Sequence, residues 1–176
     1  NYVTFMTLDS GSTVKVAPRY QQFRAVERIV HRLLTGKPGQ RGGIVWHTQG
    51  SGKSLTMTFL VRRLRTIPEL LPYKVVVVTD RTQLQDQLSE TMELSGEKID
   101  IAASGARARA LLARKGPGLV FVMIQKNRDG SPADRLDIGE VNTDESIVVL
   151  IDEAHRSHNA TLGMNLRKAL PNAARI

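Results

Sequence analysis

The sequence predicts an α/β fold in which a mainly parallel sheet carries helices on both faces. Apolar runs without polar alternation recur along the 176 residues, and the clearest are Val75–Val78 and Ile147–Ile151. Runs of this kind are typical of strands that are buried on both faces. The segments between them place apolar residues at helical spacing, so strands and helices alternate along the chain. This alternation, at this length, predicts one domain with its own core.

The predicted elements follow one another without a repeat or a low-complexity segment. Residues 1–16 form an N-terminal extension with a hairpin signal around Asp9–Ser12, and a helix follows from Pro18 to Leu34 and stops at Gly36. Strands are then expected at 43–47, 74–79, 99–102, 119–124 and 147–151, with helices at 52–65, 82–92, 107–115 and 161–170. Residues 126–145 are polar and interrupted by glycine and proline, which predicts one long loop.

Composition narrows the class of protein. The formal charge of +8 favours a polyanionic partner, with nucleic acid as the leading candidate and a merely solvated basic surface as the alternative. An aromatic content of 5% argues against binding single strands by base stacking. The longest apolar runs are far too short to span a membrane, and no charged-then-apolar leader opens the sequence. We therefore expect a cytoplasmic protein without membrane contacts. The absence of cysteine is compatible with that location.

The segment His47–Ser54 carries the strongest chemical signal. Gly50 and Gly52 can adopt positive φ and turn consecutive N–H groups inward, which makes an anion-binding nest at the start of a helix. Lys53 would then reach the phosphates of a nucleotide, and Ser54 would ligate Mg²⁺. The usual pattern has glycine six residues before the lysine, and His47 stands there instead. The residues expected to bind the nucleotide from this loop are Thr48, Gln49, Gly50, Ser51, Gly52, Lys53 and Ser54.

Two adjacent carboxylates follow the apolar run 147–151. In open α/β sheets ligands bind beyond the carboxyl ends of the strands, which is where Asp152 and Glu153 would lie. Asp152 is expected to hold Mg²⁺ and Glu153 to polarise the attacking water. A competing interpretation is a metal site built from Asp152, His155 and His158, but zinc hydrolase motifs do not follow a phosphate loop, and the chain has no cysteine to complete a structural site.

These segments resemble the first RecA-like lobe of superfamily 2 helicases and translocases, and more narrowly the motor (restriction) subunit of type I restriction enzymes. The resemblance covers residues 16–176 and rests on four stretches: 42–54, 19–26, 77–84 with Gln87, and 124–126. A histidine at the position of His47 is in character for this family. Met123 departs from the pattern, because the family often has threonine there.

The resemblance implies roles for individual residues. ATP and Mg²⁺ are the expected cofactors, and Gln22 is expected to read adenine, with Gln21 as the alternative if the helix is rotated. His155 would link the nucleotide site to the DNA-facing motifs, which makes Lys53, Asp152, Glu153 and His155 the expected catalytic set. The residues expected to contact DNA are Arg81, Thr82, Gln125 and Lys126.

The resemblance also implies a larger assembly. Residues 1–176 would form a single ATP-binding lobe, a fragment of a subunit that couples ATP hydrolysis to double-stranded DNA translocation before cleavage. Modification and specificity subunits would be its partners. The isolated lobe is expected to show little or no turnover, since motors of this kind take an arginine finger from a second lobe. The alternatives are a non-catalytic fragment that binds DNA or subunits, and a lobe of another superfamily 2 helicase.

Overall fold

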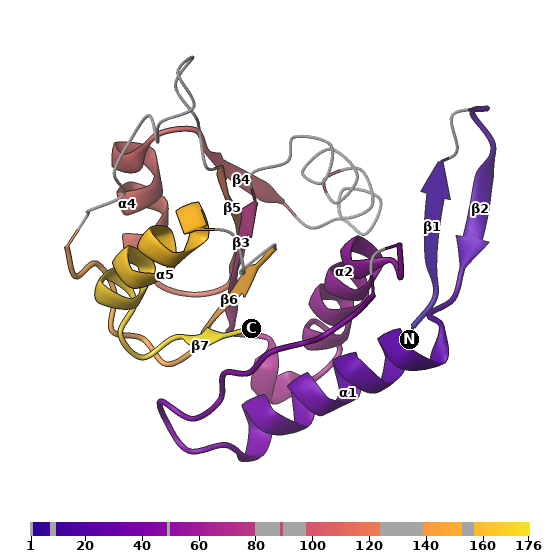
Figure 1. The fold of residues 1–176 in the computed structure, drawn as a ribbon, viewed down its shortest axis with the longest axis horizontal. Helices are drawn as coiled ribbons and strands as arrows, with labels where there is room; N and C mark the ends of the chain where they lie inside the picture. The colour runs from indigo at the N-terminus through magenta and orange to yellow at the C-terminus, as the bar shows by residue number, and fades with distance from the viewer. Residues whose placement is uncertain are drawn as a thin grey trace.

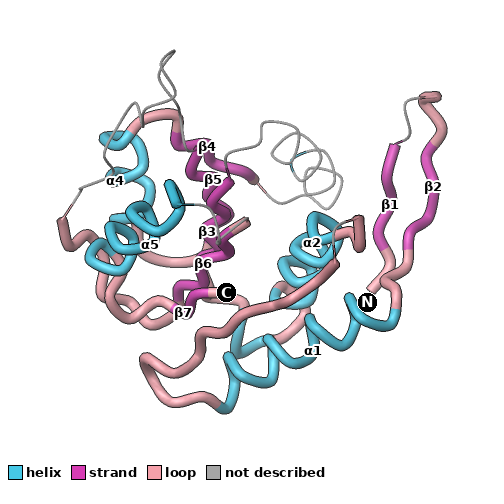
Figure 2. The backbone as a smooth tube through the Cα atoms, in the orientation of Figure 1, coloured by secondary structure: helices cyan, strands magenta, loops and turns pink. Residues whose placement is uncertain are grey.

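The computed structural model describes residues 2–7, 10–48, 50–79, 89, 98–123, 139–152 and 157–176. Figure 1 shows their arrangement, and Figure 2 separates helices, strands and loops. The elements are β1 (Thr4–Thr7), β2 (Thr13–Val16), α1 (Tyr20–Thr35), α2 (Lys53–Leu64), the 3₁₀ helix η1 (Pro68–Leu70), β3 (Lys74–Thr79), β4 (Ile99–Ala102), α4 (Gly105–Ala113), β5 (Gly118–Met123), β6 (Ile147–Ile151), α5 (Ser157–Ala169) and β7 (Ala174–Arg175).

A five-stranded sheet in the order β4-β5-β3-β6-β7 forms the centre of the fold, and all its pairs are parallel. β3 lies in the middle, with Val77 opposite Phe121 of β5 and Leu150 of β6. All six residues of β3 are buried. The predicted α/β class and parallel sheet are confirmed, and the carboxyl ends of β3, β5 and β6 lie at one edge.

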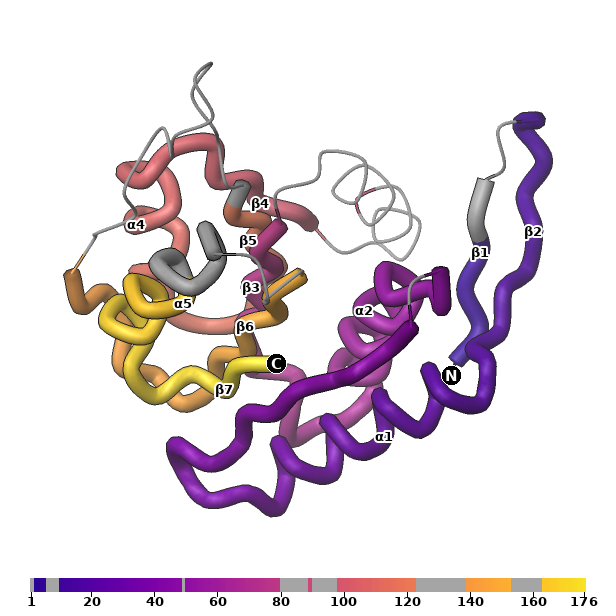
Figure 3. The backbone as a smooth tube through the Cα atoms, viewed as in Figure 1, coloured from indigo at the N-terminus to yellow at the C-terminus, as the bar shows by residue number. Residues whose placement is uncertain are grey.

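Helices cover both faces of the sheet, as expected for strands without polar alternation. α1 and α2 lie on one face and α4 and α5 on the other (Figure 3). One apolar cluster joins α1 and α2 to Val75, Val77 and Leu150, and a second joins α4 and α5 to Val76 and Val149. Successive residues of a strand point to opposite faces, so neighbouring valines serve different clusters.

The N-terminal hairpin is also confirmed. β1 pairs antiparallel with β2, with Phe5 opposite Lys15, and the ribbon stands beside the N-terminal end of α1 (Figure 1). A two-stranded ribbon is marginal by itself, and contacts with the helices hold this one. Thr4 is fully buried and accepts a hydrogen bond from Arg62 of α2 at 2.9 Å. The ring of Tyr2 packs edge-on against that of Phe23 of α1, with 4.9 Å between centroids.

The strand predicted at 43–47 is not formed in the structure. Its first residue reaches the sheet, because the N–H of Gly43 donates to the carbonyl of Arg175 in β7 at 2.8 Å. The next residues have no neighbouring strand among those described, and Ile44 and Trp46 are 92% and 89% exposed. A strand needs a partner backbone, and the two-residue β7 supplies that partner to Gly43 alone.

Other boundaries shift for local reasons. The helix expected at 107–115 begins at Gly105, because Ser104 caps it by accepting from the N–H of Arg107 at 3.2 Å. The helix expected at 161–170 is α5, and η1 and β7 were not expected. The predicted helix at 82–92 lies outside the described residues except for Ser89, as does the expected loop up to residue 138. Within the described part of the chain, no helix is long and apolar enough to cross a membrane.

A buried lysine joins the start of β3 to the end of α4. Lys74 is 3% exposed, and its ammonium group donates to the carbonyls of Leu111 at 3.1 Å, Leu112 at 3.3 Å and Arg114. These carbonyls at the carboxyl end of a helix attract a cation. Burial lowers the pKa of Lys74 below 10.5, and repulsion from Arg114 adds to this effect, whereas Asp144 and Asp100 oppose it.

This lowered pKa predicts a pH-dependent stability. Between the folded-state pKa of Lys74 and 10.5, the unfolded chain binds the lysine proton more tightly than the folded chain. The contribution of Lys74 to the free energy of unfolding should therefore rise with pH through that window. Chemical denaturation between neutral pH and about pH 10, below the ordinary lysine pKa of ~10.4, should show wild type gaining stability relative to Lys74→Met. The exposed Lys98→Met should follow wild type, and a constant difference between wild type and Lys74→Met would contradict the assignment.

Candidate functional site

The glycine loop between residue 47 and α2 has the backbone of an anion site. Gly50 and Gly52 have φ of 75° and 79°, the left-handed region that favours glycine. Gly52 occupies the N-cap position of α2 and offers no side chain to cap it, and no acidic residue lies in the first turn. The N–H groups at the start of an α-helix lack partners within the helix and carry positive partial charge. Those of α2 are therefore available to an anion.

Two buried polar atoms beside this loop have no hydrogen-bond partner among the described residues. They are Oγ of Ser51 and Nδ1 of His47. Buried polar groups are almost always paired, so an unpaired one in a native fold needs an explanation. A bound polar ligand would supply it, and both atoms lie at the loop that leads to the uncapped start of α2. The residues present therefore fit a phosphate-bearing ligand.

Gln22 of α1 holds the loop in place. Its side chain is 2% exposed, and its Nε2 donates to the carbonyls of Ser51 at 3.1 Å and Gly52 at 3.0 Å. Its Oε1 accepts from the N–H of Arg19 at 2.8 Å, which closes the first turn of α1. A Cβ at Gly52 would lie 2.6 Å from Nε2 of Gln22. Glycine is thus required at position 52 both by its φ and by this contact.

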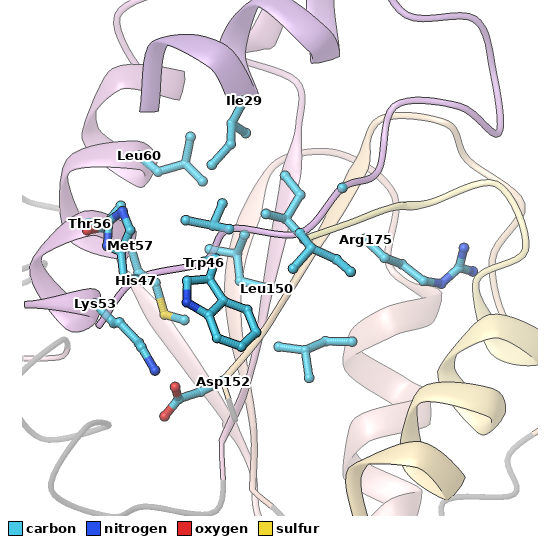
Figure 4. Close-up of a pocket in the computed structure, with 15 residues that line it drawn as sticks. Ile29, Trp46, His47, Lys53, Thr56, Met57, Leu60, Leu150, Asp152 and Arg175 are labelled. Atoms are coloured by element: carbon cyan, nitrogen blue, oxygen red, sulfur yellow. The ribbon is translucent and has the colours of Figure 1, made fainter. Parts of the chain in front are cut away.

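Lys53 and Asp152 line one cavity of about 450 Å³. Lys53 begins α2, and Asp152 follows β6 with its N–H donating to the carbonyl of Val78 at 3.0 Å. Figure 4 shows the amino group of Lys53 and the carboxylate of Asp152 directed toward the same part of this cavity. Asp152 is 9% exposed, and Lys53 and Ser54 are half-buried. The fold therefore brings together the two motifs that the sequence places about a hundred residues apart.

Other predicted site residues lie outside the described residues. These are Gln49, Glu153, His155, Arg81, Thr82, Gln125 and Lys126. The strands that lead to the last four are described, and Thr79 at the end of β3 lies opposite Met123 at the end of β5. Both strands end at the sheet edge where Asp152 follows β6. Among the described residues no cluster of three or more histidines and carboxylates could hold a metal ion.

Sequence reasoning missed two features of the site. The contact between Gln22 and the loop joins residues 29 and 30 positions apart, and no local pattern indicates such a pair. Trp46 was expected inside a buried strand, yet its ring lines the cavity and is largely exposed (Figure 4). The apolar pattern of 43–47 indicates a strand but does not reveal whether a neighbouring strand is in reach.

Comparison with known proteins identifies a family and several proteins that are similar to this chain. The family model described as SWI2/SNF2 ATPase matches residues 21–176. The HindI endonuclease subunit of a type I restriction enzyme from Haemophilus influenzae is 36% identical over 195 aligned residues, which cover 99% of this chain and 18% of the relative. The SsaAORF53P endonuclease subunit from Staphylococcus saprophyticus is 28% identical over 170 residues, covering 96% of this chain and 18% of that protein.

The chain thus spans less than a fifth of the length of these relatives. The match covers the glycine loop, the strand before Asp152 and the whole parallel sheet. The expected resemblance to type I restriction enzymes is confirmed, and so is the α/β fold of a RecA-like lobe. On this evidence of sequence and fold, the chain belongs to the SWI2/SNF2 ATPase family.

Proposed function

We propose that this chain is the ATP-binding lobe of a type I restriction endonuclease subunit that couples ATP hydrolysis to translocation along double-stranded DNA. One observation carries the proposal: the uncapped start of α2, with its two positive-φ glycines, opens beside a cavity lined by both Lys53 and Asp152. Phosphate binding at a helix N-terminus, with a carboxylate nearby for Mg²⁺, is the arrangement that nucleotide hydrolysis requires.

The residues divide the work by their chemistry. Lys53 and the loop N–H groups would hold the phosphates, and Ser54 and Asp152 would hold Mg²⁺. When bound, Mg²⁺ would neutralise phosphate charge while keeping several of its waters. Glu153 is proposed to accept a proton from the attacking water, and His155 to link the nucleotide site to the DNA-facing segments. The buried atoms of Ser51 and His47 that lack partners support a polar ligand in this loop.

Gln22 is assigned a positioning role. Both N–H groups of its side-chain amide donate to loop carbonyls, so reading adenine with them would require these bonds to be exchanged. Gln21 is exposed on the neighbouring face of α1 and is the alternative reader. The adenine contact itself remains a prediction for either residue.

The names of the relatives support the wider activity that we propose. Their names describe endonuclease subunits of type I restriction enzymes, which supports double-stranded DNA and the modification and specificity subunits as partners of the full-length protein. A catalytic arginine from a second lobe would contribute ~10³ to 10⁵ in rate, so the 176-residue chain alone should turn over slowly. A non-catalytic DNA- or subunit-binding fragment and another superfamily 2 helicase are less well supported, since the loop geometry favours a nucleotide and the relatives favour restriction.

Binding of ATP with Mg²⁺ should raise the melting temperature of the chain, and Lys53→Ala should abolish the rise. At ATP about tenfold above its Kd, stabilisation of ~1.4 kcal/mol corresponds to roughly 3 to 6 °C for a domain of this size. Differential scanning fluorimetry with and without nucleotide measures it. Lys37→Ala, which removes an exposed lysine outside the loop, should keep the wild-type shift. An equal shift in Lys53→Ala and Lys37→Ala would exclude the loop as the site.

A pair of glutamine variants separates positioning from base reading. Gln22→Ala leaves two loop carbonyls and the N–H of Arg19 unpaired, and each unpaired buried group costs about 1 to 3 kcal/mol. It should weaken ATP and GTP binding by the same factor, because the loop binds phosphates. Gln21→Ala should change stability by less than about 0.5 kcal/mol. Calorimetric titration with both nucleotides decides the matter: if Gln22→Ala weakens ATP alone, Gln22 reads adenine.

DNA binding should be backbone-directed and salt-sensitive. One lobe neutralises few phosphates, so the Kd for any duplex should be ~10⁻⁴ to 10⁻⁶ M, with a log–log salt slope of about −0.9 per phosphate contacted. Arg81→Ala and Lys126→Ala should each flatten that slope by about one unit on all sequences alike. Lys115→Ala, at the opposite end of the strand that precedes Lys126, is the matched control. If all three variants keep the wild-type slope in a duplex titration, the DNA roles given to Arg81 and Lys126 are wrong.

A further inference from the structure

A row of exposed side chains follows the outer side of α1. Tyr20, Arg24, Arg28 and Arg32 recur at every fourth position of this helix, and all four are exposed. Residues four positions apart on an α-helix form one ridge, which rises ~6 Å from each member to the next. We call these four residues the outer ridge, and it extends over about 18 Å.

The outer ridge is directed away from the sheet. The residues of α1 that are buried are Gln22, Val26, Ile29, Val30 and Leu33. The apolar ones among them belong to the cluster that α1 shares with α2 and the sheet. At ~100° of rotation per residue, Arg24 lies on the opposite side of the helix from this buried face. α1 lies at the margin of the molecule, with α2 and the sheet on its inner side (Figure 1), so the ridge is presented to solvent.

The positive charges of the ridge are not balanced within the helix. Glu27 is the one carboxylate in the sequence of α1, and it accepts hydrogen bonds from Arg63 at 3.0 Å and from Tyr2. Among the described residues, the ridge arginines take part in no ion pair with a carboxylate. Like charges four positions apart destabilise a helix. Three arginines kept on one ridge at this cost indicate a negatively charged partner.

The ridge also keeps hydrogen-bond donors for such a partner. Arg24 donates from Nη1 to the hydroxyl of Tyr20 at 3.5 Å, and Arg32 donates from Nε to the carbonyl of Gln40 at 3.1 Å. A guanidinium group carries five N–H donors, so these contacts within the described part of the chain leave most of them open. Arginine and tyrosine both donate to phosphate oxygens at protein–DNA interfaces.

Two kinds of partner carry enough negative charge, an acidic protein surface and a nucleic-acid backbone. The centre of a protein interface is depleted of charged residues and rich in apolar ones. On α1 this order is reversed, because arginines occupy the middle of the exposed face and the exposed Phe23 and Leu34 lie on its flank. Duplex DNA carries one phosphate charge per ~1.7 Å of its axis, so a stretch as long as the ridge offers several. The distribution of charge therefore favours the backbone of nucleic acid.

We propose that the outer ridge of α1 is a phosphate-binding surface for duplex DNA, in addition to the DNA contacts proposed above for Arg81 and Lys126. The ridge arginines would each engage a phosphate oxygen, and Tyr20 would donate its hydroxyl to another. Contacts of this kind do not depend on base sequence. The ridge lies on the outer side of the layer formed by α1 and α2, whereas Arg81 and Lys126 follow β3 and β5 in the sequence. The chain would thus bind duplex DNA at two places, and neither the ridge nor its test depends on nucleotide.

Three double variants test the ridge. Arg24→Gln/Arg28→Gln removes two ridge charges and keeps good helix formers. Arg24→Lys/Arg28→Lys keeps both charges. The matched control Lys98→Gln/Lys115→Gln removes two exposed charges near the amino ends of β4 and β5. Fluorescence anisotropy measures the binding of each 176-residue chain to a labelled duplex of about 20 base pairs, over a salt series from about 50 to 200 mM.

Arg24→Gln/Arg28→Gln should flatten the log–log salt slope by about two units, while the lysine variant and the control keep the wild-type slope. Over the salt series, the affinity of the glutamine variant should fall ~10-fold less than that of wild type. Its melting temperature should equal or exceed that of wild type, because a pair of like charges four positions apart is removed. The loss of binding would then have no structural cause.

Two results would overturn the proposal. One is a glutamine variant with the wild-type slope, and the other is a control that flattens the slope equally, because net charge alone would then explain the effect. A polyglutamate peptide is the probe for an acidic protein partner: weaker polyglutamate binding with an unchanged duplex slope would assign the ridge to a protein instead. Adding Arg81→Ala/Lys126→Ala to the glutamine variant should flatten the slope further. If it does not, only the DNA roles proposed for Arg81 and Lys126 are contradicted.

Discussion

The parallel pairing of β3 with both β5 and β6 is the constraint on which the rest of the structure depends. A parallel strand flanked on both sides must bury both faces, and β3 is buried along its whole length. Helices then have to cover the sheet on each side, which gives the two apolar clusters. Parallel strands also finish at a common edge, so Asp152 after β6 and the segments after Thr79 and Met123 start from neighbouring positions. The candidate site lies at this edge because the carboxyl ends of β3, β5 and β6 meet there.

The opposite edge shows complementary electrostatics. Lys74 places its ammonium group on the terminal carbonyls of α4, and Arg175 of β7 donates to the carbonyls of Arg167 and Leu170 at the end of α5. Cations thus satisfy helix carboxyl ends, while the amino end of α2 has no side-chain cap and its first turn contains Lys53 but no acid. A helix start without acidic compensation is unfavourable for an isolated fold and favourable for one that binds an anion. This difference between the helix ends favours the interpretation that the glycine loop binds an anion.

The sequence predicted what depends on local pattern and not what depends on distant partners. The bounds of β3, β4 and β6 agree with the predicted ranges 74–79, 99–102 and 147–151. For β3 and β6 the reason is that uninterrupted apolar runs leave little freedom in a buried parallel sheet. The glycine loop and its helix were also predictable, since positive φ and helix starts have local chemical signatures. By contrast, the prediction of a strand at 43–47 was wrong, because a strand needs a neighbouring backbone with which to pair. The hydrogen bonds from Gln22 to the glycine loop could not be predicted for the same reason, because their acceptors are 29 and 30 residues away in the sequence.

Arg175 links α5, the parallel sheet and the segment that leads to the glycine loop. Its side chain donates to carbonyls at the end of α5, its strand pairs with β6, and its carbonyl accepts from the N–H of Gly43. From Gly43 the chain continues through Trp46 and the glycine loop into α2, and the loop is held a second time by Gln22 of α1. The loop is therefore fixed firmly at its α2 end and by one main-chain bond at its sheet end.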